Sequence, residues 1–130
     1  MTRPRPAGIL PCHLGRGDAS ANSMTEKYIL VLCTCPEDVM ASRIGTTLVE
    51  EHLASCVNRL SRVVSTYWWK GKLETDTEAL LMIKTSERLL PRLSKRIEEL
   101  HPAELPEIIT LPITGGSERY LEWLGQNLAR

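Results

Sequence analysis

The most informative segment of this chain is Thr66-Tyr67-Trp68-Trp69-Lys70-Gly71-Lys72-Leu73-Glu74, which has the signature of a β-hairpin. Aromatic and β-branched residues favour strands, and Lys70-Gly71 supplies a tight turn that joins two antiparallel strands. The strand after the turn continues through the apolar segment 79–83 to Thr85. A hairpin this long and this apolar on both faces cannot be covered by a single layer of helices. We therefore expect the chain to associate with copies of itself.

Strands and helices alternate along the rest of the chain. Residues 28–34 form a continuous apolar run, which is typical of a central strand buried on both faces. The segment from Pro36 to about Ala54 has apolar residues at every fourth position and predicts an amphipathic helix. A second strand region begins near Cys56, and Asn58 and Ser61 in it predict a bulge or a break before Val63.

The last third of the chain repeats this alternation. Ser86 is expected to cap a second helix, which ends near His101 because prolines follow it. Residues 107–113 predict a fourth strand, and Pro112 places that end at an edge of the sheet because proline lacks an N–H. A short helix, capped by Ser117, completes the chain.

The element order β-α-β-β-α-β plus one helix predicts an α+β fold, a ferredoxin-like sandwich with an additional C-terminal helix. Right-handed crossovers make the first strand parallel to the second and the third parallel to the fourth. Cys33, His101 and Trp69 are therefore expected at one edge of the sheet, and Cys56 and Lys84 at the opposite edge. Because a seven-residue strand spans about 23 Å, Cys56 cannot share a metal ion with Cys33 within one subunit.

Length and charge limit the classes of function. The chain has 130 residues, which is enough for one domain. Its formal net charge is zero, so no overall positive electrostatic field attracts nucleic acid. We expect residues 1–23, which are rich in Pro, Gly and Arg, to be a disordered N-terminal extension of a domain spanning residues 24–130. The neighbours Cys12 and His13 in that extension are interpreted as incidental.

The cysteines predict a reducing environment. Cys33 and Cys35 are too close within one strand to pair readily, and no second cluster mirrors them. We therefore expect a cytoplasmic protein. No apolar run approaches the roughly 20 residues of a membrane helix, so no membrane partner is expected.

Six segments of the chain, taken together, resemble the divalent-cation tolerance protein family CutA. They occur in order from about Tyr28 to Leu128 and are Val31-Leu32-Cys33-Thr34 with Pro36; Leu53-Ala54-Ser55-Cys56-Val57-Asn58; Tyr67-Trp68-Trp69-Lys70-Gly71-Lys72; Ile83-Lys84-Thr85; His101-Pro102 through Pro106-Glu107; and Tyr120-Leu121-Glu122-Trp123-Leu124. The resemblance implies a ferredoxin-like subunit in a tight homotrimer, similar in architecture to the PII signalling proteins. It also implies a cytoplasmic role in tolerance of copper and other divalent metals.

The first candidate site is a metal site at Cys33 and His101, where the resemblance implies copper ligands. Thiolate and imidazole are both ligands for copper and zinc. Some members of the family have two adjacent histidines, but the first of that pair is Leu100 here, so one ligand is missing. Cys35 points to the same face of its strand as Cys33 and could chelate with it. The alternatives are that Cys33 is a small buried apolar residue and that His101 caps the helix end.

The second candidate site is a pocket between subunits. Its residues match motif positions of the family and are Trp69, Lys84, Glu107 and Tyr120. An anion could meet Lys84 there. Alternatively, Lys84 pairs with a glutamate across the interface, and the tryptophan belongs to the interface core.

No feature of the sequence predicts an enzyme, because it has no Ser-His-Asp pattern, no paired carboxylates in a plausible cleft and no phosphate-binding glycine loop. We therefore expect a non-enzymatic, cytoplasmic homotrimer that binds copper, or zinc or another divalent cation, weakly and has no nucleic-acid or membrane partner. The sequence does not identify a protein partner. The alternative is a PII-like structural or signalling trimer that binds a small ligand between subunits, with incidental metal binding.

Overall fold

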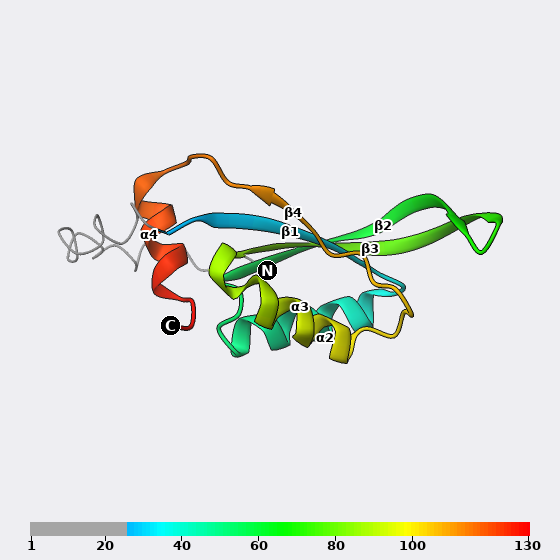
Figure 1. Cartoon of the computed structure of the whole chain (residues 1–130), viewed down its shortest axis with the longest axis horizontal. Helices are drawn as coiled ribbons and strands as arrows, with labels where there is room; N and C mark the ends of the chain where they lie inside the picture. The colour runs from blue at the N-terminus through cyan, green and yellow to red at the C-terminus, as the bar shows by residue number, and fades with distance from the viewer. Residues whose placement is uncertain (1–25) are drawn as a thin grey trace.

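The computed structural model describes residues 26–130, which form one sheet with helices packed beside it (Figure 1). The elements, in chain order, are β1 (Tyr28–Cys35), α2 (Asp38–Glu50), β2 (Cys56–Trp69), β3 (Lys72–Ser86), the 3₁₀ turn η2 (Glu87–Leu89), α3 (Leu90–Leu100), β4 (Ile109–Pro112) and α4 (Glu118–Gln126). The α+β class and the order of strands and helices are as predicted. The predicted disordered extension, residues 1–23, lies outside the described residues, as do Cys12 and His13.

All neighbouring strands of the sheet are antiparallel, and their order is β2-β3-β1-β4. β1 therefore runs parallel to β2, and β3 runs parallel to β4, as the crossovers required. β1 pairs with β3 along its whole length, whereas β4 pairs with β1 only from Ile109 to Pro112. β4 is thus shorter than the predicted 107–113, and Pro112 lies on an edge strand as predicted.

The helices α2 and α3 cover only one face of the sheet (Figure 1). Alternate residues of β1 point to that face, where Val31 packs in the core with Ile44 of α2 and Leu93 of α3. Within the described chain, the opposite face carries no helix over its centre. It presents apolar side chains that are partly or largely exposed, namely Leu30, Leu32, Leu80, Met82 and Leu111. None of the described helices is long and apolar enough to cross a membrane.

β2 and β3 continue past the rest of the sheet as a two-stranded ribbon (Figure 1). β1 ends at Cys35, whereas β2 and β3 stay paired as far as Trp69 opposite Lys72. On this ribbon Trp68 is 73% exposed and Leu73 is 63% exposed. The apolar side chains of this hairpin are therefore largely exposed to solvent within one described chain.

The hairpin has the turn and the irregularity that the sequence predicted. Lys70 and Gly71 have φ angles of 51° and 81°, which suit a two-residue hairpin turn with both central residues left-handed. The register of β2 on β3 shifts between Leu60 and Val63, and Arg62 has a φ of 62° in this bulge. The bulge changes the direction of the ribbon relative to the sheet.

The predicted cap at Ser86 is wrong, whereas the cap at Ser117 is confirmed. The Ser86 hydroxyl donates to the carboxylate of Glu26 and to the carbonyl of Lys27, and it makes no capping bond to the following turn. The chain therefore makes the 3₁₀ turn η2 before α3 begins. Ser117 accepts a hydrogen bond from the N–H of Tyr120 in the first turn of α4.

A buried threonine allows a test of how the sheet is tied to the helical layer. Thr85 is fully buried, and its hydroxyl donates a 2.7 Å hydrogen bond to the carbonyl of Leu53, in the segment after α2. Thr85→Val keeps the shape but removes the donor, so we expect the free energy of unfolding to fall by about 1–3 kcal/mol. Urea denaturation at a fixed protein concentration measures this. Thr77→Val, at an exposed position of the same strand, should change it by less than about 0.5 kcal/mol. Equal stability of the two variants would contradict this role for Thr85.

Candidate metal centre

Two cysteines of β1 face the helical layer. Cys33 and Cys35 lie on the same face because side chains alternate along a strand, and both are 0% exposed. Their backbones pair with Leu81 and Ala79 of β3. Neither cysteine is in a disulfide, and both belong to the main core cluster. Their positions are therefore set by the central strand pair.

His101 ends α3, and its ring lies against the end of β1. Its backbone N–H donates to the carbonyl of Ile97, the closing hydrogen bond of the helix. Nε2 lies 2.7 Å from the carbonyl oxygen of Thr34, and the backbone N–H of Ala103 donates to Nδ1 at 3.0 Å. Because Nδ1 accepts, the ring proton is on Nε2, which donates to Thr34. Both ring nitrogens therefore have hydrogen-bond partners.

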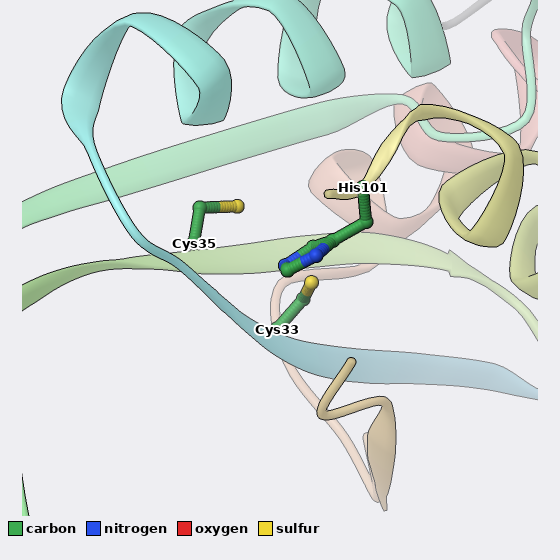
Figure 2. A group of neighbouring side chains, drawn as sticks. All are labelled: Cys33, Cys35 and His101. Atoms are coloured by element: carbon green, nitrogen blue, oxygen red, sulfur yellow. The ribbon is translucent and has the colours of Figure 1, made fainter. Parts of the chain in front are cut away.

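The two thiols and the imidazole form one cluster (Figure 2). The donor atoms of Cys33, Cys35 and His101 all lie within 4.8 Å of one another, and all three side chains are buried. Figure 2 shows the imidazole reaching from the end of α3 towards the two sulfurs on β1. The fold thus brings Cys33 and His101 to the same edge of the sheet and adds Cys35 to them. His101 also occupies the C-cap position considered from the sequence.

The two thiols differ in acidity because they lie close together in the core. The neighbouring Cys33 thiol holds the pKa of Cys35 below its ordinary value. The neighbouring Cys35 sulfur raises the pKa of Cys33, and burial and the nearby negative charges of Glu107 and Glu78 raise it further. The Cys33 thiol itself donates to the carbonyl of Thr34, 3.9 Å away. The pair therefore favours a state in which Cys33 keeps its proton and Cys35 is the more readily ionised thiol.

Cys56 lies away from this cluster. It pairs with Lys84 near one end of β3, whereas Cys33 pairs with Leu81 from the other side of β3. Three residues along a strand correspond to about 10 Å, and two strand spacings add about 9.6 Å across the sheet. This geometry agrees with the prediction that Cys56 cannot share an ion with Cys33 within one subunit.

The four residues of the predicted pocket do not all meet within one chain. Lys84 Nζ lies 3.3 Å from the hydroxyl of Tyr120 and 5.5 Å from the centre of its ring, at the end of the sheet where α4 packs. Trp69 pairs with Lys72 at the tip of the hairpin, beyond the end of β1, whereas Glu107 precedes β4 and lies near Cys33 and Glu78. A pocket that contains all four side chains would therefore require a second copy of the chain.

Two neighbours of the candidate sites were missed by reasoning from the sequence. Trp123 lies beside Tyr120, with ring centres 5.4 Å apart, and their spacing of three residues in a helix was an available signal. Glu78 raises the pKa of Glu107 by charge repulsion, after the larger effect of burial. This second proximity depends on the register of three strands, for which the sequence contains no direct signal.

Comparisons with known proteins show the family to which the chain belongs. The family model of the CutA1 divalent ion tolerance protein matches residues 29–127. A divalent-cation tolerance protein CutA from Thermus thermophilus is 44% identical over 98 residues, which cover 75% of this chain and 95% of that protein. Its solved structure superposes with a TM-score of 0.77 at 42% identity, over 78% of this chain and 99% of that one. The chloroplastic CutA 1 protein of Oryza sativa is 43% identical over 80% of this chain, which spans only 59% of that relative's length.

The raised pKa of Glu107 predicts a pH dependence of stability. The folded protein holds this proton more tightly than the unfolded chain does, because the carboxyl group is partly desolvated and faces Glu78. The resulting stabilisation is complete below the unfolded pKa and is lost as the pH rises through the folded pKa. Glu107→Gln should therefore be more stable than the wild type above that folded pKa.

Urea denaturation at intervals from about pH 4 to pH 7 measures this difference. Glu98→Gln is the control, because Glu98 is exposed and has no ion-pair partner among the described residues. If the stability difference between Glu107→Gln and the wild type does not grow with pH, the assigned environment of Glu107 is wrong.

Proposed function

Because the chain belongs to the CutA1 divalent ion tolerance family, we propose that it acts in metal tolerance by binding copper reversibly at Cys33 and His101. The observation that carries this proposal is the meeting of a buried thiol and an imidazole, with a second thiol beside them, within 4.8 Å. Thiolate and imidazole are the ligands that copper prefers among protein side chains. The donor set therefore fits the ion.

The hydrogen bonds of His101 support weak rather than tight binding. To coordinate an ion, the ring must either release the N–H of Ala103 from Nδ1 or lose its Nε2 proton and release the carbonyl of Thr34. Breaking such a bond costs about 0.5–1.5 kcal/mol. Structural zinc sites use four protein ligands, whereas three donors meet here among the described residues. The arrangement favours a labile copper contact over a structural zinc site.

The proposed assembly is the homotrimer that the family resemblance implies. Among residues 26–130, one face of the sheet is apolar and carries no helix over its centre, and the hairpin exposes Trp68 and Leu73. Burial of such surface against other copies of the chain is favourable, at about 25 cal/mol per Å². Free thiol ligands require a reducing environment, which supports a cytoplasmic location. In this proposal the protein is not an enzyme, and metal binding itself is its activity.

A second candidate function is a PII-like trimer that binds a small ligand between subunits. The observation that favours it is the separation of the pocket residues, because Lys84 contacts Tyr120 at one end of the sheet whereas Trp69 lies at the tip of the hairpin at the other. Neighbouring copies could bring the two ends together. Stoichiometric copper in protein purified without added metal supports the metal proposal, whereas metal-free protein that remains fully assembled supports this alternative.

The copper proposal predicts that Cys33 controls affinity. Cys33→Ser replaces a soft thiolate with a hard hydroxyl, so we expect the copper dissociation constant to rise at least about tenfold. Isothermal titration with copper under reducing, oxygen-free conditions measures it. Cys56→Ser is the matched control, because that thiol lies outside the cluster, and it should bind like the wild type. Equal affinity of Cys33→Ser and the wild type would show that the site is wrong.

The proposed assembly predicts unequal effects at two exposed apolar residues. Trp68 on the hairpin and Val39 on α2 are 73% and 76% exposed in the single chain. Trp68→Ser should raise the dissociation constant of the assembly at least about tenfold, because buried tryptophans dominate many interfaces. Val39→Ser, on the helical side of the subunit, should leave it unchanged. Sedimentation equilibrium over a dilution series distinguishes these outcomes, and a wild-type protein that is monomeric at micromolar concentration would exclude the trimer.

A further inference from the structure

We propose that Cys35 is a metal ligand of the same centre, and that with Cys33 it forms a dithiolate site that selects Cu(I) over divalent ions. This inference rests on the metal binding proposed above and deepens it. It identifies the ion as a soft, monovalent one, although the family is described by its tolerance of divalent ions. It also transfers the main binding role from the imidazole to a second thiol.

The first argument is the distance between the sulfurs. A metal–thiolate bond is about 2.3 Å long, so two sulfurs bound to one ion lie at most about 4.6 Å apart. The sulfurs of Cys33 and Cys35 lie within 4.8 Å of each other on the same face of one strand. One ion can therefore bridge them with small changes of side-chain rotamer.

The second argument is that the thiols remain available for an ion. Residues two apart in a strand have Cα atoms about 6.6–6.8 Å apart, at the upper limit for a disulfide. The pairing of Cys33 with Leu81 and of Cys35 with Ala79 holds β1 extended at this point, so the chain cannot shorten the distance. The geometry thus opposes a disulfide between the two cysteines and permits a shared metal ion.

The third argument is the number and type of free donors. Both nitrogens of His101 make short hydrogen bonds, whereas the Cys33 thiol makes only a weak 3.9 Å contact with the carbonyl of Thr34. The sulfurs are therefore released from their present partners more easily than the imidazole is. Glu78 adjoins Ala79, whose side chain is buried on the thiol face, so by alternation Glu78 belongs to the opposite face of the sheet. Two soft sulfur donors suit Cu(I), whereas Zn²⁺ requires about four ligands and Cu(II) favours nitrogen and oxygen in a square arrangement.

Binding exchanges protons for an ion and involves no electron transfer. One Cu(I) ion forms two Cu–S bonds, and the two thiol protons leave to solvent. The copper must arrive already reduced, as it does in a reducing compartment. Both cysteines lie in the apolar core, so an ion bound there would be shielded from bulk water.

The test is competition for Cu(I) between the full chain and a coloured Cu(I) chelator in oxygen-free buffer. Every protein carries Cys12→Ala, so that the thiol outside the described residues does not contribute. In this background we compare the otherwise wild-type chain with Cys33→Ala, Cys35→Ala, His101→Gln and Cys56→Ala. Cys33→Ala and Cys35→Ala should each weaken Cu(I) binding at least tenfold, His101→Gln less than either, and Cys56→Ala not at all.

A second measurement does not depend on whether a variant folds. X-ray absorption at the copper edge of the loaded Cys12→Ala protein should show two sulfur neighbours. Wild-type affinity in a folded Cys35→Ala protein, or a single sulfur neighbour, would overturn the dithiolate. If Cys33→Ala still loses copper in that case, the proposed function survives. If the protein with all other cysteines intact fails to compete for Cu(I) at all, the proposed function is wrong and this inference falls with it.

Discussion

The antiparallel pairing of β1 with β3 determines which side chains of the sheet face the helices and which face away from them. It runs along all of β1 and assigns alternate residues to opposite faces. One set, which includes Cys33 and Cys35, is buried under the helices, and the other set, which includes Leu30 and Leu32, faces away from them. A slip of one residue would exchange the two sets. The same register therefore both hides the thiols and leaves an apolar surface that favours association.

His101 connects this strand pair to two other parts of the chain. It closes α3, holds the end of β1 through the carbonyl of Thr34, and accepts the N–H of Ala103 at the start of the segment that leads to β4. Any movement of the ring that accommodates an ion must alter one of these bonds. β4, which follows that segment, is an edge strand of the sheet.

The sequence was sufficient for the element order, the hairpin turn and the edge that Cys33 and His101 share, because each follows from periodicity, turn residues and the hand of the crossovers. The sequence did not predict hydrogen bonds in which one side chain has several possible partners. Ser86 has the character of a cap, but the carboxylate of Glu26 competes for its hydroxyl. The two hydrogen bonds of His101 involve backbone groups of Thr34 and Ala103, so the types of these residues do not predict them. The separation of Lys84 from Trp69 within one chain likewise depends on how far the hairpin extends beyond β1.

The burial of the cysteines reconciles the two interpretations that the sequence left open for them. As neutral thiols they pack like small apolar residues, so the core is complete without an ion. Ionising both of them inside that core is unfavourable, and nearby Glu78 and Glu107 make it more so for Cys33. In the proposed site, part of the energy of each metal–sulfur bond would therefore be offset by the energy of placing charge in an apolar site. A fold that is complete without the ion, and that would limit its affinity in this way, would also release it, which is the behaviour that the proposed role in metal tolerance requires and that a structural metal site lacks.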